Sequence, residues 1–167
     1  MASINKRSDF AIYPVNVGGG QVALSPIPGR YGNYEADLSA VLHWSPDIVL
    51  SMTGQPELDH VGAGEFGDDL RLAGVTWQHL PIVDFSTANA SIEAKWCDVS
   101  AQCSDVLAKG GRILSHCFGG CGRSGMMALR LMIDTGEDPR AALFRLRQAR
   151  PCAVEKEAQF NWAARVV

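Results

Sequence analysis

One stretch of ten residues, 116–125, combines side chains that could hold and cleave a phosphate ester. It reads His-Cys-Phe-Gly-Gly-Cys-Gly-Arg-Ser-Gly, so a thiol at Cys117 and a guanidinium at Arg123 enclose a glycine-rich run. A Cys and an Arg at this spacing arise easily by chance, but His116 before the thiol and Ser124 after the guanidinium make the combination specific. The stretch predicts an active site that binds an oxyanion.

The elements on either side of this stretch must position it. Residues 112–116 are short and apolar and follow two glycines, which predicts a strand entering the core, whereas residues 123–133 are apolar almost throughout and predict a buried helix. A loop between a strand and a helix N-terminus can direct backbone N–H groups and the helix dipole at one anion. We therefore expect the substrate to contact Phe118, Gly119, Gly120, Cys121, Gly122 and Arg123.

The same residues suggest a reaction. A helix N-terminus, converging amides and Arg123 all favour the ionised form of the Cys117 thiol, which could attack phosphorus and form a phosphocysteine. The planar guanidinium of Arg123 would hold two phosphate oxygens, and the Ser124 hydroxyl would hydrogen-bond the sulfur and help it leave. His116 is expected to orient the loop through its ring nitrogens. The competing interpretation is a tight glycine turn around an inert, buried Cys117.

Cys121 lies in the same loop, four residues after the candidate nucleophile. The simpler interpretation is a small residue that fills space. The alternative is a resolving thiol that forms a reversible disulfide with Cys117 after peroxide has oxidised Cys117 to a sulfenic acid.

Cleavage of a phosphate ester also needs a proton for the leaving oxygen, so a carboxylic acid should lie nearby. Asp84 is the best candidate, because it ends an apolar run, residues 75–83, that predicts a strand, and a polar segment, residues 86–89, follows it. The alternative is that Asp84 only caps the following turn.

The stretch from His116 to Ser124 resembles the signature of the cysteine-dependent protein tyrosine phosphatase superfamily. Together with the segments at residues 80–84 and 150–155 and with Gln159, it is most similar to the dual-specificity branch, among kinase-associated and Cdc14-like phosphatases. The resemblance covers the C-terminal half of the chain. It implies a phosphatase that hydrolyses phosphotyrosine and also phosphoserine or phosphothreonine in proteins.

The resemblance also implies residue roles. Asp84 would be the general acid on a loop that closes over the substrate, although Ala88 stands where the family often has proline, which bears on the stiffness of that loop. Gln159 would position the hydrolytic water, unless it is only an exposed residue of a terminal helix. Because residues 118–122 include no Lys or Arg, inositol phosphates are less expected as substrates. The alternatives are a pseudophosphatase that binds phosphoproteins, or an arsenate or sulfur-transfer enzyme with a similar loop.

Composition is compatible with one enzyme domain over residues 1–167. The chain is 47% hydrophobic and 20% charged, and its net charge of -3 gives no support for binding nucleic acid or an anionic membrane. The four histidines and five cysteines show no metal-ligand spacing, so we expect no metal or other cofactor. Residues 1–7 lack the apolar core of a secretory signal and a thiolate suits a reducing compartment, so a cytoplasmic location is expected. The oligomeric state is left open.

The remaining pattern alternates between strands and helices. It predicts a single α/β domain with a central, mainly parallel sheet flanked by helices, similar to the dual-specificity phosphatases. The expected strands are residues 10–15, 21–25, 47–52, 75–83 and 112–116, and the expected helices are residues 34–44, 64–73, 92–107, 123–133, one that begins at Asp138-Pro139, and 154–167.

Overall fold

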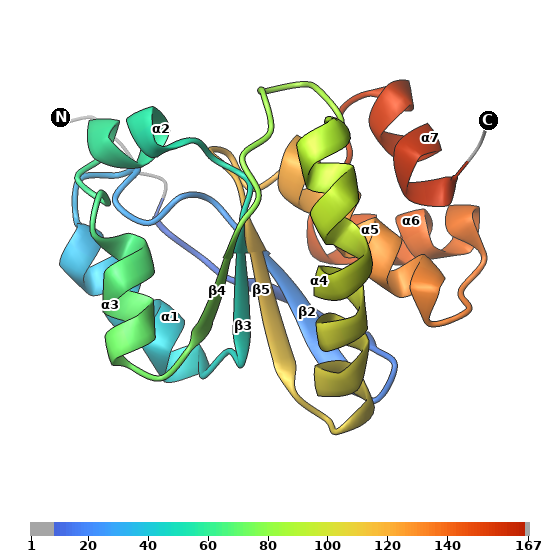
Figure 1. Ribbon diagram of the computed structural model, residues 1–167, viewed down its shortest axis with the longest axis horizontal. Coiled ribbons are helices and arrows are strands. Elements are labelled where there is room, and N and C mark those ends of the chain that lie inside the picture. The colour runs from blue at the N-terminus through green and yellow to red at the C-terminus, as the bar shows by residue number, and fades with distance from the viewer. Residues whose placement is uncertain (1–8, 166–167) are drawn as a thin grey trace, which may run out of the picture.

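The computed structural model describes residues 9–165, in which five strands form one mixed sheet with helices on both faces (Figure 1). The spatial order is β1-β2-β5-β3-β4; β1 pairs with β2 in an antiparallel manner and all other neighbours are parallel. The predicted α/β fold with a mainly parallel sheet is therefore confirmed. The strands are β1 (Tyr13–Val17), β2 (Gly20–Ser25), β3 (Ile48–Ser51), β4 (Thr76–His79) and β5 (Arg112–His116).

The helices divide between the two faces of the sheet (Figure 1). On one face lie α1 (Tyr34–Trp44), α2 (Gln55–His60) and α3 (Phe66–Leu72). On the other lie α4 (Ala90–Ala108), α5 (Gly122–Asp134), α6 (Pro139–Ala149) and α7 (Glu157–Ala164).

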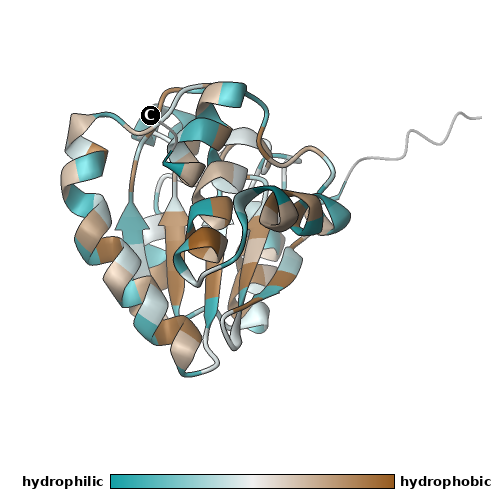
Figure 2. Cartoon of the chain, turned by 90° about the vertical axis from the view of Figure 1, so that its right-hand side faces the viewer, coloured by the Kyte–Doolittle hydropathy of each residue, from teal (hydrophilic) through white to brown (hydrophobic). Residues whose placement is uncertain are grey.

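Successive residues of the central strands supply the two apolar cores in turn. In β5, Ile113 packs in the core under α4 to α7, whereas Leu114 packs in the core under α1 to α3. Ile48 and Val49 of β3 divide in the same way, because neighbouring side chains of a strand point to opposite faces. Figure 2 shows the brown, apolar strands enclosed by helices whose colours alternate between teal and brown. A sheet covered on both faces explains why β3 and β5 are apolar without alternation.

Several helices begin where a short polar side chain satisfies a free backbone N–H. The side chain of Asn33 accepts from Ala36 N at the start of α1, and that of Asp138 accepts from Ala141 N at the start of α6. Helix α6 thus begins at Asp138-Pro139, as the sequence predicts. The predicted helix over residues 92–107 is also present as α4, with Trp96 and Cys103 buried against the core.

Two predicted strands begin or end three or more residues away from their predicted bounds. The strand expected over residues 10–15 is found as β1, which begins at Tyr13, and the one expected over residues 75–83 ends at His79. Strand β4 stops there because its partner β3 ends at Ser51, although Leu80 N still donates to Ser51 O (2.8 Å). The chain from residue 80 to residue 89 thus leaves the sheet as a loop, which carries Asp84.

The C-terminal helix also begins later than predicted. Val154 lies outside it with a positive φ of 64°, and α7 starts at Glu157. Residues 1–7, which bear on the prediction of no secretory signal, and residues 166 and 167 of the predicted helix lie outside the described residues.

Candidate active site

Three parallel strands end beside one another and form the base of the candidate site. In the sheet register, His116 at the end of β5 stands opposite Ser25 of β2 on one side and Ser51 of β3 on the other. The chain leaves β5 into residues 117–123, the glycine-rich loop, and enters α5. The carboxyl edge of parallel strands is where open α/β sheets bind ligands.

The carbonyl groups of the glycine-rich loop are bonded to surrounding groups. Phe118 O accepts from Ile27 N at 3.1 Å, and Arg150 donates to Gly119 O at 3.0 Å and to Gly120 O at 3.3 Å. Because these peptide oxygens are turned to partners outside the loop, their amide groups can face the opposite side, as in other anion-binding loops.

Glycine is required at position 120 for two reasons. Its φ is +72°, and a Cβ there would lie only 2.6 Å from the backbone nitrogen of Pro26. A larger residue would displace either the glycine-rich loop or the chain that follows β2.

Cys117 lies at the start of the loop and is buried, with 3% of its surface exposed. Its Sγ is 3.2 Å from the Oγ of Ser124, which is fully buried in the first turn of α5. The Ser124 carbonyl in turn accepts from the Ser115 hydroxyl on β5 at 3.0 Å. The structure therefore brings together the predicted nucleophile and the predicted hydroxyl partner of the sulfur.

His116 is buried beneath the loop and is held by Ser51. Trp77 Nε1 donates to Ser51 Oγ at 2.8 Å, and the same hydroxyl is hydrogen-bonded to His116 Nε2 at 2.5 Å. Burial, and next the positive charge of Arg123, lower the pKa of His116 from 6.5 to about 4. His116 is thus neutral at pH 7, and its Nδ1 lies 3.4 Å from Cys117 O. This arrangement suits an orienting residue rather than a base.

Arg123 is buried, and its guanidinium is held by Glu57 of α2 and by Ile82 of the loop after β4. Its Nη2 and Nη1 donate to the two carboxylate oxygens of Glu57 at 2.8 and 3.0 Å, and Nη1 also donates to Ile82 O at 2.9 Å. Burial alone would lower the pKa of Arg123, but the bond to Glu57 and the nearby negative charges raise it overall. The Nε has no hydrogen-bond partner among the described residues, and its nearest carboxylate oxygen is Asp84 Oδ1 at 3.4 Å.

Glu57 is a site residue that the sequence analysis missed. It lies at the third position of α2, where it also accepts from Gly54 N at 2.9 Å. Burial would raise the pKa of Glu57, but the hydrogen bonds from Arg123 and Gly54 lower it overall, so the carboxylate stays ionised beside the guanidinium. A proline followed by a glutamate is typical of the first turn of a helix, so Pro56 and Glu57 could have predicted the start of α2 from sequence. No helix was expected between the strand at residues 47–52 and the helix at residues 64–73.

Asp84 lies on the loop that follows β4, with Oδ1 3.4 Å from Arg123 Nε. Its side chain is 55% exposed, and one oxygen accepts from the backbone N of Phe85 at 3.0 Å. Phe85 has a positive φ of 60°, which is unusual for a bulky residue, and its ring and the Val83 side chain are exposed. Asp84 thus both caps the turn that follows it and lies beside Arg123.

Gln159 is fully buried, which differs from an exposed residue on a terminal helix. Its Oε1 accepts from Glu155 N and Lys156 N at 3.0 and 3.2 Å, and its Nε2 donates to Ser86 O at 3.3 Å. A Cβ on Gly122 would lie 3.1 Å from both polar ends of the Gln159 side chain. Gln159 therefore joins α7, the Asp84 loop and the start of α5.

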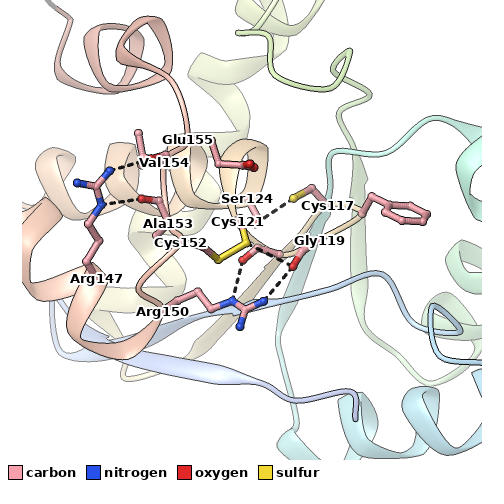
Figure 3. The surroundings of a disulfide bond; sticks show 12 residues. Cys117, Gly119, Cys121, Ser124, Arg147, Arg150, Cys152, Ala153, Val154 and Glu155 are labelled. Atoms are coloured by element: carbon pink, nitrogen blue, oxygen red, sulfur yellow. Dashed lines mark hydrogen bonds between the residues drawn. A yellow bond between two sulfur atoms is a disulfide. The ribbon is translucent and has the colours of Figure 1, made fainter. Parts of the chain in front are cut away.

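Cys121 forms a disulfide with Cys152, a partner that the sequence analysis did not consider (Figure 3). Neither interpretation of Cys121, as a space-filling residue or as a resolving thiol for Cys117, matches this pairing. Cys97, Cys103 and Cys117 are free.

Comparison with solved structures shows which fold this is. A crystal structure of kinase-associated phosphatase with its catalytic cysteine changed to serine aligns with a TM-score of 0.80 at 20% identity, over 95% of this chain and 94% of that one. Tk-PTP in its active form aligns at 0.70 and 26% identity, over 93% and 98%. This chain has the fold of the dual-specificity phosphatases. The resemblance to the cysteine-dependent protein tyrosine phosphatases is thereby confirmed.

A third similar structure is that of a phosphatase-like interacting protein. The human tyrosine phosphatase-like serine/threonine/tyrosine-interacting protein aligns with a TM-score of 0.66 at 16% identity, over 91% of this chain and 92% of that one. No family model matches the sequence, and no curated protein matches it.

The described part of the chain shows neither a metal-binding cluster nor a membrane-spanning helix. Within residues 9–165, no group of three or more His, Cys, Asp or Glu side chains is placed to hold a metal ion. No helix in the same range has the length and apolar character needed to cross a membrane.

Proposed function

We propose that this protein is a phosphatase that hydrolyses phosphate monoesters through a phosphocysteine on Cys117. The observation that carries the proposal is the buried Cys117 sulfur, 3.2 Å from Ser124 Oγ at the base of a loop that ends in the buried Arg123. The dual-specificity phosphatase fold supports the same class of reaction.

Phosphate binding rests on Arg123 and the amides of the glycine-rich loop. Glu57 accepts from Nη1 and from one proton of Nη2, so Nε and the second Nη2 proton remain for two phosphate oxygens. A rigid, charged fork of this kind suits the planar spacing of two phosphate oxygens. The positive end of α5 adds to the attraction.

In the first step, the Cys117 thiolate attacks phosphorus and the bond to the ester oxygen breaks. The leaving oxygen takes a proton from the Asp84 carboxyl, which lies on an exposed loop that can move towards the substrate. In the second step, a water attacks phosphorus and gives a proton to the Asp84 carboxylate that the first step left behind. The S–P bond breaks, and the Ser124 hydroxyl donates a hydrogen bond to the departing sulfur. Gln159 Nε2 has a second N–H beyond the one that it donates to Ser86 O, and this N–H would orient that water.

The proposed substrates are phosphotyrosine and phosphoserine or phosphothreonine in proteins. The exposed side chains of Val83 and Phe85 flank Asp84 and offer apolar contacts to the substrate's own side chain. One similar structure is described as PTPMT1 in complex with PI(5)P, at 18% identity. Residues 118–122 of the present loop include no Lys or Arg, which favours protein over inositol phosphate substrates here.

The proposal treats residues 1–167 as one catalytic domain and places it in the cytoplasm, where Cys117 stays reduced. Partners beyond the phosphoprotein substrate are not assigned.

Hydrolysis of para-nitrophenyl phosphate, with and without a chelator, tests the proposal. Cys117→Ser and Arg123→Ala should nearly abolish the rate, because the first removes the nucleophile and the second the phosphate clamp. Acid-quenched protein should carry one phosphoryl group on Cys117, detected by mass spectrometry. Equal rates for Cys117→Ser and wild type would end the assignment.

The interacting protein among the similar structures makes a binding module the second candidate. Single-turnover experiments with enzyme in excess over a phosphotyrosine peptide separate the two functions. A phosphatase releases one phosphate per peptide, whereas a binding module retains the intact phosphopeptide.

A further inference from the structure

A disulfide joins the glycine-rich loop to the segment between α6 and α7 (Figure 3). Cys121 is the residue that caps the N-terminus of α5 and is partly buried. Cys152 lies 31 positions later in the turn after α6 and is exposed. We call residues 150–154 the bracing segment.

Hydrogen bonds connect the same two parts of the chain. Arg150 donates through Nη2 to Gly119 O and through Nε to Gly120 O, and Val154 N donates to Cys121 O at 3.1 Å (Figure 3). The bonds from Arg150 fix the orientation of two peptide groups in the glycine-rich loop. Arg150 is only two residues from Cys152, so the disulfide limits how far this guanidinium can move.

The bracing segment is itself attached to α6. Arg147 donates through Nε to Ala153 O at 2.9 Å and through Nη2 to Val154 O at 2.8 Å. The Arg150 guanidinium also lies over the Tyr13 ring of β1, 4.4 Å from its centre. The disulfide therefore ties the glycine-rich loop to a segment with its own anchors on a helix and a strand.

We propose that Cys121 and Cys152 form a redox switch that sets the phosphate affinity of the glycine-rich loop. The disulfide holds the loop amides in the orientation that binds an oxyanion, and reduction releases the bracing segment and weakens binding. The redox switch rests on the proposed function, since the disulfide acts on the same anion site. In a reducing compartment an exposed disulfide is more often a sensor than a permanent bond.

The chemistry needs a thiol reductant such as glutathione. Its thiolate attacks the exposed Cys152 Sγ, the S–S bond breaks, and Cys121 leaves as a thiolate at the positive N-terminus of α5, which favours its departure. A second glutathione resolves the mixed disulfide on Cys152. Overall, two glutathione thiols are oxidised to one glutathione disulfide, and the protein disulfide gains two electrons and two protons. Glutathione disulfide drives the reverse reaction.

Anion binding by Cys117→Ser protein tests the switch without oxidation of the nucleophile. Tungstate affinity is measured by calorimetry after treatment with glutathione disulfide and again after treatment with dithiothreitol. We expect the Kd to rise about tenfold on reduction, because the loop must then be ordered when the anion binds. Peptide mapping of the oxidised sample should show the Cys121–Cys152 link.

Two variants complete the test. Cys117→Ser combined with Cys152→Ser should bind tungstate as weakly as the reduced protein, whatever the redox treatment. Cys117→Ser combined with Cys97→Ser, which removes an exposed thiol on α4, should keep the full response. Equal tungstate affinity of the oxidised and reduced Cys117→Ser protein, or no link in the map, would overturn the switch.

Turnover distinguishes this proposal from the proposed function. With the nucleophile intact, para-nitrophenyl phosphate hydrolysis in glutathione buffers should show a KM that rises about tenfold on reduction, with a smaller change in kcat. Redox-dependent tungstate binding without hydrolysis in any buffer would refute only the phosphatase. Hydrolysis whose KM does not respond to glutathione would refute only the switch.

Discussion

Glu57 binds both terminal nitrogens of Arg123, at 2.8 and 3.0 Å, and so fixes the plane in which the guanidinium faces the glycine-rich loop. The carboxylate comes from α2 and the guanidinium from α5, on opposite faces of the sheet. The pair thus depends on the tertiary fold, and its loss would leave a buried cation without its partner.

Glu57→Gln should lower kcat/KM for para-nitrophenyl phosphate by about 10- to 100-fold, because a neutral amide holds the guanidinium less firmly. Stability should fall by only about 1–3 kcal/mol, since the Glu57 side chain is 32% exposed and solvent screens part of the charge. Steady-state kinetics and urea unfolding check both values. Asp59→Asn, at an exposed carboxylate of the same helix, is the control, and an equal loss in that variant would refute a specific role for Glu57.

Asp84→Asn should slow hydrolysis by an amount that depends on the leaving group. Phenyl phosphate, whose phenolate needs a proton, should lose about 100-fold or more, and a substrate with a strongly acidic phenol should lose much less. The measurement is a plot of log kcat/KM against leaving-group pKa for wild type and variant. Asp98→Asn, on the exposed side of α4, serves as the control. Parallel plots for Asp84→Asn and wild type would remove Asp84 from its role.

Ser124→Ala should slow the second step more than the first, because the hydroxyl 3.2 Å from Cys117 Sγ would donate to the departing sulfur. The expected result is a stoichiometric burst of para-nitrophenol followed by a steady rate about 10- to 100-fold below wild type. Rapid-quench kinetics measure the burst, and phosphocysteine should accumulate. A slow rate without a burst would show that Ser124 acts in the first step instead.

We expect the free energy of unfolding to fall as the pH drops from 6.5 towards 4, because of the buried His116. Its pKa is lowered to about 4 in the folded protein, so in this range the unfolded chain binds the proton more readily and acid favours unfolding. The full contribution is on the order of 3 kcal/mol, present above pH 6.5 and lost through this window. Urea unfolding at a series of pH values measures it.

His116→Gln should flatten the dependence of stability on pH between 4 and 6.5. His60→Gln, at an exposed position of α2, controls for the loss of a histidine. A slope that is the same in His116→Gln as in wild type would contradict a neutral, buried His116.

The segment from β5 to α5 could be predicted from sequence because its determinants are local. Residues 112–116 form a strand and α5 is buried as expected, since an apolar run and a set of glycines specify both without distant partners. Glu57 could not be assigned in the same way. Its six-residue helix is too short for an apolar repeat, and its partner Arg123 is 66 positions away.

The disulfide illustrates the same limit. Five cysteines allow many pairings, and only the packing of the bracing segment against the glycine-rich loop places Cys152 beside Cys121. Gln159 was found through a family resemblance, but its burial depends on the contact with Ser86, which no helical pattern shows.

Asp84 and an incoming phosphate compete for the same donor of Arg123, the Nε at the edge of the guanidinium. The guanidinium Nε, with no hydrogen-bond partner among residues 9–165, has the Asp84 carboxylate 3.4 Å away. A phosphate dianion seated on that nitrogen must push the carboxylate aside, and so each arrival of substrate would reset the position of the proton donor. Binding of the phosphate ester and positioning of the Asp84 carboxyl as its proton donor would then occur together rather than in two separate steps.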